Sequence, residues 1–191
     1  MKEISLHILD IAENSISAGA DHISIWIGED KKSGMLKIRI EDNGKGMNLN
    51  EVMQTGDPFF TSRTTRRVGL GIPLFRLQAE LTGGSMEIHS ERGKGTRVEA
   101  EFGIDHPDKQ PMGDLEGCWM LLAVSNPAIE WALECETGKG KFSISTTEIR
   151  SALEVDVIKG RETTTLLKRM IRNNLDSIGM DLELVENSRL K

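Results

Sequence analysis

Hydrophobic residues near the start of the chain recur first with a helical period and then with the period of a strand. Residues 22–27 and 35–41 alternate apolar with polar side chains, which predicts two strands that each bury one face. The turn-forming residues 31–34 lie between them and predict a β-hairpin. Before the hairpin, residues 3–18 predict an amphipathic helix that ends near Gly19, because one side of it gathers apolar or small residues. These residues are Ile4, Ile8, Ile11, Ala12, Ser15 and Ile16.

The regular pattern stops after the hairpin. Residues 42–47 (Asp-Asn-Gly-Lys-Gly-Met) form a turn cluster, and residues 48–68 are polar and irregular apart from a short helix predicted at 49–54. A loop of this length inside a compact domain is usually functional or mobile.

Regular structure returns over residues 70–81, whose apolar spacing is helical, with Pro73 in the first turn where proline is tolerated. Two more strands are predicted at residues 85–90 and 97–102, joined by the turn 92–95.

A stretch with two prolines and no apolar periodicity, residues 105–114, predicts a linker between residues 1–104 and a small α+β domain at 115–191. We expect this second domain to bind a partner or to form a homodimer. Its predicted elements are strands at 117–125, 129–136 and 141–145, a helix from about 147 and a helix at 162–178.

Two cysteines and two tryptophans of the second segment are interpreted as core residues. Cys118 and Cys135 are too few for a disulfide scaffold, although a hairpin turning at residues 126–127 would make them cross-strand neighbours. Trp119 and Trp131 flank the same predicted hairpin, and burial in the core is preferred over an interface.

Composition narrows the function classes. The 191 residues carry a formal net charge of −6, which argues against a nucleic-acid-binding surface. No run of about 20 apolar residues exists to span a bilayer, and no basic-then-apolar segment opens the chain. We expect a cytoplasmic protein that binds neither membranes nor nucleic acid.

Four separated pieces of residues 1–104 carry candidate chemistry. Asp10 and Asn14 are four residues apart, so they project from one helical face, where an amide oxygen suits Mg²⁺ and a carboxylate could orient a water for attack on phosphorus. A solvated polar face is the simpler interpretation of this helix alone. Asp42 ends a strand, where its carboxylate could accept from an exocyclic amine while Gly44 and Gly46 admit a flat base, although such turns are common.

The other two pieces lie in or after the long loop. The adjacent aromatics Phe59 and Phe60 are expected to pack onto the domain, and Arg63 could face phosphate oxygens. Residues 69–71 (Gly-Leu-Gly) open a helix, whose N-terminal N–H groups favour phosphate. Residues 93–96 (Gly-Lys-Gly-Thr) form a turn between strands, which could belong to the same site or be purely structural.

In this order, the pieces resemble the GHKL superfamily of gyrases, a heat-shock chaperone, histidine kinases and mismatch-repair ATPases. Residues 13–20 look like the mismatch-repair branch, whereas residues 57–71 look like the histidine-kinase branch. The resemblance covers residues 1–104 and implies a two-layer α/β sandwich, the Bergerat ATP-binding fold. The matching motifs are an N box (10–14), two glycine boxes (42–46 and 69–71), a phenylalanine box (57–60) and a final box (93–96).

The resemblance also implies roles for individual residues, with Mg-ATP as the ligand. Asn14 would hold Mg²⁺, Asp10 would occupy the position of the catalytic base, and Asp42 would accept from the adenine amine. Residues 61–67 would form a lid over ATP. The other residues implied at the nucleotide are Gly44, Gly46, Met47, Phe60, Thr61, Ser62, Arg63, Arg67, Gly69, Leu70, Gly71 and Thr96.

The sequence departs from the family pattern at two positions. Asp10 stands where hydrolytic members carry the longer glutamate and many kinases carry asparagine. Arg67 stands where the second glycine box usually begins with a glycine, and it would either stiffen the lid or offer a charge to the phosphates.

Three uses of ATP stay open. None of the four histidines lies in the sequence context of a phospho-acceptor, so a self-contained histidine autokinase is not expected. The chain would be a protein kinase acting on a partner, the ATPase part of a split histidine kinase, or a protein whose interface is switched by ATP with little turnover. A signalling kinase or kinase-like regulator is the preferred prediction.

Overall fold

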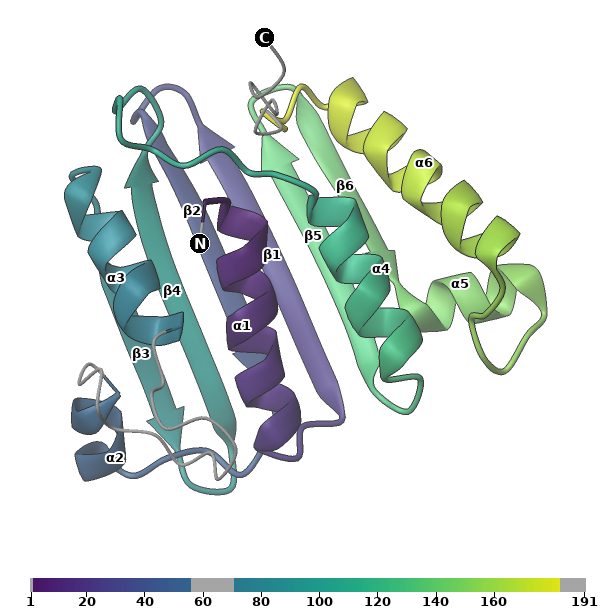
Figure 1. The fold of residues 1–191 in the computed structure, drawn as a ribbon, viewed down its shortest axis with the longest axis horizontal. Helices are drawn as coiled ribbons and strands as arrows, with labels where there is room; N and C mark the ends of the chain where they lie inside the picture. The colour runs from purple at the N-terminus through teal and green to yellow at the C-terminus, as the bar shows by residue number, and fades with distance from the viewer. Residues whose placement is uncertain (1, 56–70, 183–191) are drawn as a thin grey trace, which may run out of the picture.

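Six strands form one sheet in the order β3-β4-β2-β1-β5-β6 (Figure 1). The computed structural model describes residues 2–55 and 71–182 of the chain. The strands are β1 (His22–Asp30), β2 (Met35–Asp42), β3 (Met86–Glu91), β4 (Gly95–Gly103), β5 (Glu130–Thr137) and β6 (Gly140–Ser145). The helices are α1 (Ile4–Ser17), α2 (Leu49–Gln54), α3 (Gly71–Leu81), α4 (Leu115–Ser125), α5 (Thr146–Leu153) and α6 (Arg161–Ser177).

Four helices cover one face of this sheet. Figure 1 shows α3, α1 and α4 over the strands and α6 beside α4 at the β6 edge of the sheet, and neighbouring helices in this row contact one another. The prediction of a two-layer α+β sandwich is therefore confirmed. No helix within the described ranges combines the length and the hydrophobicity needed to cross a bilayer.

The alternation of apolar and polar residues decides which side of each strand the helices cover. Ile25 of β1, Ile40 of β2 and Val98 of β4 are buried on the helical side, where Ile8 and Ile11 of α1 are buried as well. A strand with one apolar face gains free energy by turning that face toward a helical layer, at roughly 25 cal/mol for each Å² of apolar surface buried.

The opposite face of the sheet is charged. Its side chains form ion pairs between neighbouring strands, so this face is stabilised without a second layer of helices. The pairs include Lys37–Glu101 at 2.7 Å, Arg39–Glu99 at 2.7 Å and Arg97–Glu41 at 3.3 Å.

Residues 115–125 form helix α4, so the strand predicted at 117–125 is wrong. The segment is almost entirely apolar, so apolar and polar residues do not alternate with a helical period. The reason is that α4 packs between α1 and α6 and against β5. A helix buried on several sides carries no polar stripe to reveal its period. Asp114 caps the helix by accepting from the backbone N–H of Gly117 at 2.8 Å.

The hairpin proposed around residues 126–127 is consequently wrong as well. Cys118 lies on α4 and Cys135 on β5, and both are free thiols. Trp119 and Trp131 are 1% and 0% exposed, which confirms that both belong to the core.

Strand β5 connects the C-terminal part to the rest of the fold. It pairs in parallel with β1, from His22 opposite Glu130 to Glu29 opposite Thr137. The strands that follow residues 105–114 therefore continue the sheet of residues 1–104. The division into two domains at that stretch stays a prediction.

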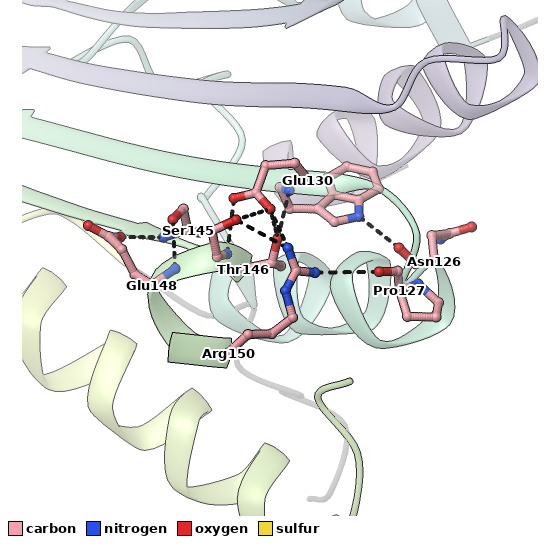
Figure 2. Close-up of polar contacts among 9 residues, drawn as sticks. Asn126, Pro127, Glu130, Ser145, Thr146, Glu148 and Arg150 are labelled. Carbon is pink, nitrogen blue, oxygen red and sulfur yellow. Dashed lines mark hydrogen bonds and ion pairs between the residues drawn. The ribbon is translucent and has the colours of Figure 1, made fainter. Parts of the chain in front are cut away.

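Glu130, at the start of β5, joins this strand to α5 (Figure 2). Its carboxylate accepts from the hydroxyls of Thr146 and Thr147 at 2.8 and 2.7 Å, from the backbone N–H of Thr147 at 3.0 Å and from Arg150 at 2.7 Å. Acceptors are favoured at a helix N-terminus, where backbone N–H groups lack partners. A capping box formed by Ser145 and Glu148 satisfies further donors of the same turn.

These donors also change the acidity of Glu130. Partial burial raises the pKa of its carboxyl group, but the hydrogen bonds from Thr147 and Thr146 and the charge of Arg150 outweigh burial, and the pKa lies below its ordinary value. Because the pKa is lower in the folded state, the stabilisation is complete above the ordinary pKa of about 4.3. This stabilisation is lost as the pH falls through the lowered pKa that Glu130 has in the folded protein.

Glu130→Gln is expected to lower the free energy of unfolding by about 2 kcal/mol at pH 7, because hydrogen bonds to a charged group are lost. Urea denaturation of both proteins measures this difference, which should vanish in acid once the carboxylate of the parent is protonated. Glu134→Gln, at an exposed position of the same strand, is the matched control and should change little. Equal losses from the two substitutions would contradict the role given to Glu130.

Candidate functional site

The side chain of Asp42 lies at the end of β2, buried beneath α1. Only 8% of the residue is exposed. The Ser15 hydroxyl donates to its Oδ2 at 2.6 Å, and the backbone N–H of Gly44 donates to its Oδ1 at 2.9 Å. A buried carboxylate is costly unless donors surround it, so these two bonds make the position tenable.

The turn after Asp42 is held by its own polar groups. The side-chain oxygen of Asn43 accepts from the backbone N–H groups of Asp21 and His22, both at 3.0 Å. The backbone N–H of Lys45 donates to the carbonyl of Ala18 at 3.0 Å. The turn is thereby fixed to the end of α1 and the start of β1.

Two glycines let the strand ends approach this turn closely. Gly46 has φ +61°, and a Cβ there would collide with the carbonyl oxygen of Glu91. Gly95 has φ +100°, and a Cβ there would collide with the carbonyl oxygen of Asp42. Both positions therefore require glycine, for backbone conformation and for space.

Ser90 of β3 is the centre of a second small network. Its hydroxyl oxygen lies 2.8 Å from the donating backbone N–H of Met47, 2.9 Å from the carbonyl of Gly95 and 2.8 Å from the hydroxyl of Thr96. Met47 and Thr96, both predicted at the nucleotide, are thus linked through a residue that the sequence analysis did not single out.

A cavity of about 510 Å³ opens beside Asp42 and Thr96. Ile88, Leu49 and Val52 contribute apolar side chains to its lining, and Ser90 and Thr96 contribute hydroxyls. Its volume lies within the range of about 300–1,000 Å³ usual for small-molecule sites. The ionisable residues Glu41, His89, Glu91, Lys94 and Arg97 line the cavity as well, so it offers a small apolar surface for a flat ring beside many polar groups.

Asp10 and Asn14 are half-buried on α1. A Cβ built on Gly71, the first residue of α3, would lie 2.5 Å from Oδ2 of Asp10. The structure therefore brings the predicted catalytic carboxylate against the predicted phosphate-binding helix start. Asn14 precedes Ser15 directly, so the predicted metal ligand neighbours the residue that holds Asp42.

The predicted lid lies outside the described residues. This concerns Phe60, Thr61, Ser62, Arg63, Arg67, Gly69 and Leu70, for which the roles implied by the resemblance stay predictions.

His7 is buried in the core, 1% exposed, and its ring packs against Phe75 with 5.4 Å between ring centroids. Its Nε2 lies 3.1 Å from the side-chain oxygen of Gln110. Burial lowers the pKa of His7, and the hydrogen bond with Gln110 opposes this only in part. The imidazole is therefore neutral at pH 7 and enclosed, which suits a core residue and not an exposed phospho-acceptor.

Two residues of the site, Ser15 and Ser90, were missed by sequence reasoning. Each occupies a position that the hydrophobic period assigns to the buried side, Ser15 with Ile8 and Ile11 and Ser90 with Ile88. A polar side chain on an apolar face signals a buried hydrogen-bond partner, and this signal could have found both.

Comparison with known proteins agrees with this geometry. The family described as "Histidine kinase-, DNA gyrase B-, and HSP90-like ATPase" matches residues 2–106, more than half of the chain. The chain belongs to this family.

The similar curated proteins include sensor histidine kinases. Over 156 residues the chain is 28% identical to the sensor histidine kinase RcsC of Escherichia coli strain K12. The aligned region covers 71% of this chain and 16% of RcsC. It is 27% identical over 106 residues to the sensor histidine kinase ZraS of Escherichia coli O157:H7, covering 56% of this chain and 23% of ZraS. The chain thus spans less than a quarter of either relative.

A crystal structure of the N-terminal domain of a DNA repair protein shares the fold. It aligns with a TM-score of 0.50 and 19% identity over 76% of this chain and 53% of that chain. Together with the family match, this confirms the predicted Bergerat fold.

Gly95→Ala is expected to lower the free energy of unfolding by more than about 2 kcal/mol, because it combines an unfavourable φ with a collision against Asp42. Gly93→Ala is the matched control in the same turn, since its φ is +78° but no atom lies within 4 Å of an added Cβ. It should cost about 1 kcal/mol. Urea denaturation compares the two variants. Equal losses in the free energy of unfolding would show that the close approach of Gly95 to Asp42 does not affect stability.

Proposed function

We propose that the chain binds Mg-ATP in the cavity beside Asp42 and acts as a signalling kinase, or kinase component, that phosphorylates a partner protein. Two contacts of α1 carry this proposal: Ser15, the residue after Asn14, donates to Asp42, and Asp10 lies against Gly71 at the start of α3.

Base recognition follows from the chemistry of Asp42. Each carboxylate oxygen can accept two hydrogen bonds, and the protein supplies one to each through Ser15 and Gly44. The remaining capacity suits the 6-amino group of adenine. A guanine would present a carbonyl oxygen at this position, where two acceptors repel, so adenine is the expected base.

The phosphate end of the nucleotide would lie toward the start of α3 and the polar face of α1. A helix N-terminus favours phosphate through its unpaired N–H groups. An amide oxygen of Asn14 fits Mg²⁺, which accepts few protein ligands and shares phosphate oxygens. No group of three or more His, Cys, Asp or Glu residues in the described ranges could hold a metal alone. When bound, the ion would neutralise charge that develops on the transferred phosphate.

Transfer to a partner is favoured over transfer to the chain itself. His7 is buried, and His22, His89 and His106 lie on strands or in the stretch after β4, without the sequence context of a phospho-acceptor. The family match and the similarity to sensor histidine kinases support an ATP-dependent signalling role.

Asn14→Ala is expected to weaken ATP binding at least tenfold in the presence of Mg²⁺ and to leave binding in EDTA unchanged, because only the metal contact is removed. Titration calorimetry under both conditions measures this. Asn173→Ala, at an exposed position of α6, is the control and should bind as the parent does. Parallel losses with and without Mg²⁺ would contradict the assignment of Asn14 as a metal ligand.

A time course with γ-labelled ATP and Mg²⁺ tests the reaction itself. We expect bound ATP, no stable label on the chain and slow release of phosphate, since no acceptor is present. Asp10→Asn should remove the slow release, because the amide is a far weaker base than the carboxylate.

Other outcomes would change the assignment. Rapid, steady phosphate release that requires Asp10 would identify an ATPase and contradict the kinase proposal. Stable label on the chain would contradict a phospho-acceptor on a separate partner protein.

A further inference from the structure

We propose that Ser15 is a positioning residue for nucleotide recognition, one that sets which purines the site accepts by fixing the carboxylate of Asp42. This inference rests on the proposed function, since it concerns the same cavity. Its starting point is the 2.6 Å hydrogen bond from the Ser15 hydroxyl to Oδ2 of Asp42, which is buried and spans 27 residues of sequence.

The direction of this bond is determined by the chemistry of the partners. A carboxylate only accepts, so the single proton of the Ser15 hydroxyl points at Asp42. Oδ1 is held independently by the backbone N–H of Gly44 at 2.9 Å. With one donor on each oxygen, the plane of the carboxylate is fixed by two elements, helix α1 and the turn after β2.

A comparison within the same helix shows that this arrangement is not the default for a serine. Serine hydroxyls inside helices commonly donate to the carbonyl four residues earlier. Ser17 does so, donating to the carbonyl of Glu13 at 2.8 Å on the exposed side of α1. Ser15, two residues before it, is 4% exposed and donates across to β2.

The consequence for recognition depends on directionality. A hydrogen bond weakens steeply when donor and acceptor are misaligned. Without the Ser15 hydroxyl, the carboxylate can rotate about its own bond, and its unused lone pairs no longer face one place in the cavity. Only a ligand with an amino group at that place loses affinity, whereas a ligand without one has no bond to lose.

This distinction gives a test that a merely structural role would not pass. The binding of ATP is compared with that of purine riboside 5′-triphosphate, which lacks the 6-amino group, for the parent chain and for Ser15→Ala. We expect Ser15→Ala to weaken ATP about tenfold, the effect of losing an aligned hydrogen bond to a charged group. Binding of the analogue should change less than about twofold.

Three further variants complete the experiment. Ser17→Ala, which removes a hydroxyl from the same helix, should bind both nucleotides as the parent does. Ser15→Thr keeps the donor and should recover most of the affinity for ATP. Ser15→Ala added to Asp42→Asn should cause no further loss, because the two residues act through one contact.

The outcomes separate the two proposals. If the parent chain binds no ATP, the proposed function fails and this inference fails with it. If the parent binds ATP but Ser15→Ala binds it equally well, or weakens both nucleotides to the same extent, the role of Ser15 alone is overturned.

Discussion

The requirement that a buried carboxylate be surrounded by donors connects the local chemistry of this protein to its fold. Asp42 ends β2 beneath α1, and Ser15 is the donor that reaches it from the helix. Because this bond joins the buried side of α1 to one strand end, it also fixes the position of Asn14, the residue before Ser15 on the helix. Gly95 then becomes obligatory, since the neighbouring strand has to pass against the carbonyl of Asp42.

Most of the fold was predictable because most of its elements have one buried face. The two-residue alternation located the strands of residues 1–104, and glycines marked the turns between them. Helix α4 was not predictable in this way, since it is buried between α1, α6 and β5 and its sequence contains no polar stripe. The parallel pairing of β1 with β5 was not predictable either, because about 100 residues separate the partners and no local pattern encodes a non-local pair.

Most polar residues of the candidate site were predictable from the sequence, whereas the hydrogen bond between Ser15 and Asp42 was not. These polar residues could be grouped because their order along the chain resembles a known family. The structure places Asp10 against Gly71 and joins Ser15, next to Asn14, to Asp42. Helical spacing alone classified Ser15 as a core position, which is correct for its burial and incomplete for its chemistry. Periodicity reports which side chains are buried, whereas the partner of a buried hydroxyl depends on the tertiary structure.

The C-terminal part of the chain is connected to the turn after β2 through hydrogen bonds of Asp21, as well as along the chain. The side chain of Asn43 accepts from the backbone N–H of Asp21, and the carbonyl of Asp21 accepts from the N–H of Glu130 at 2.8 Å. The carboxylate of Glu130 in turn holds the N-terminus of α5 (Figure 2). Residue 130 lies beyond the residues 2–106 that match the ATPase family. The first strand beyond the family match therefore begins on Asp21, which also supports the turn after β2. The stability of this turn thus depends on both parts of the chain.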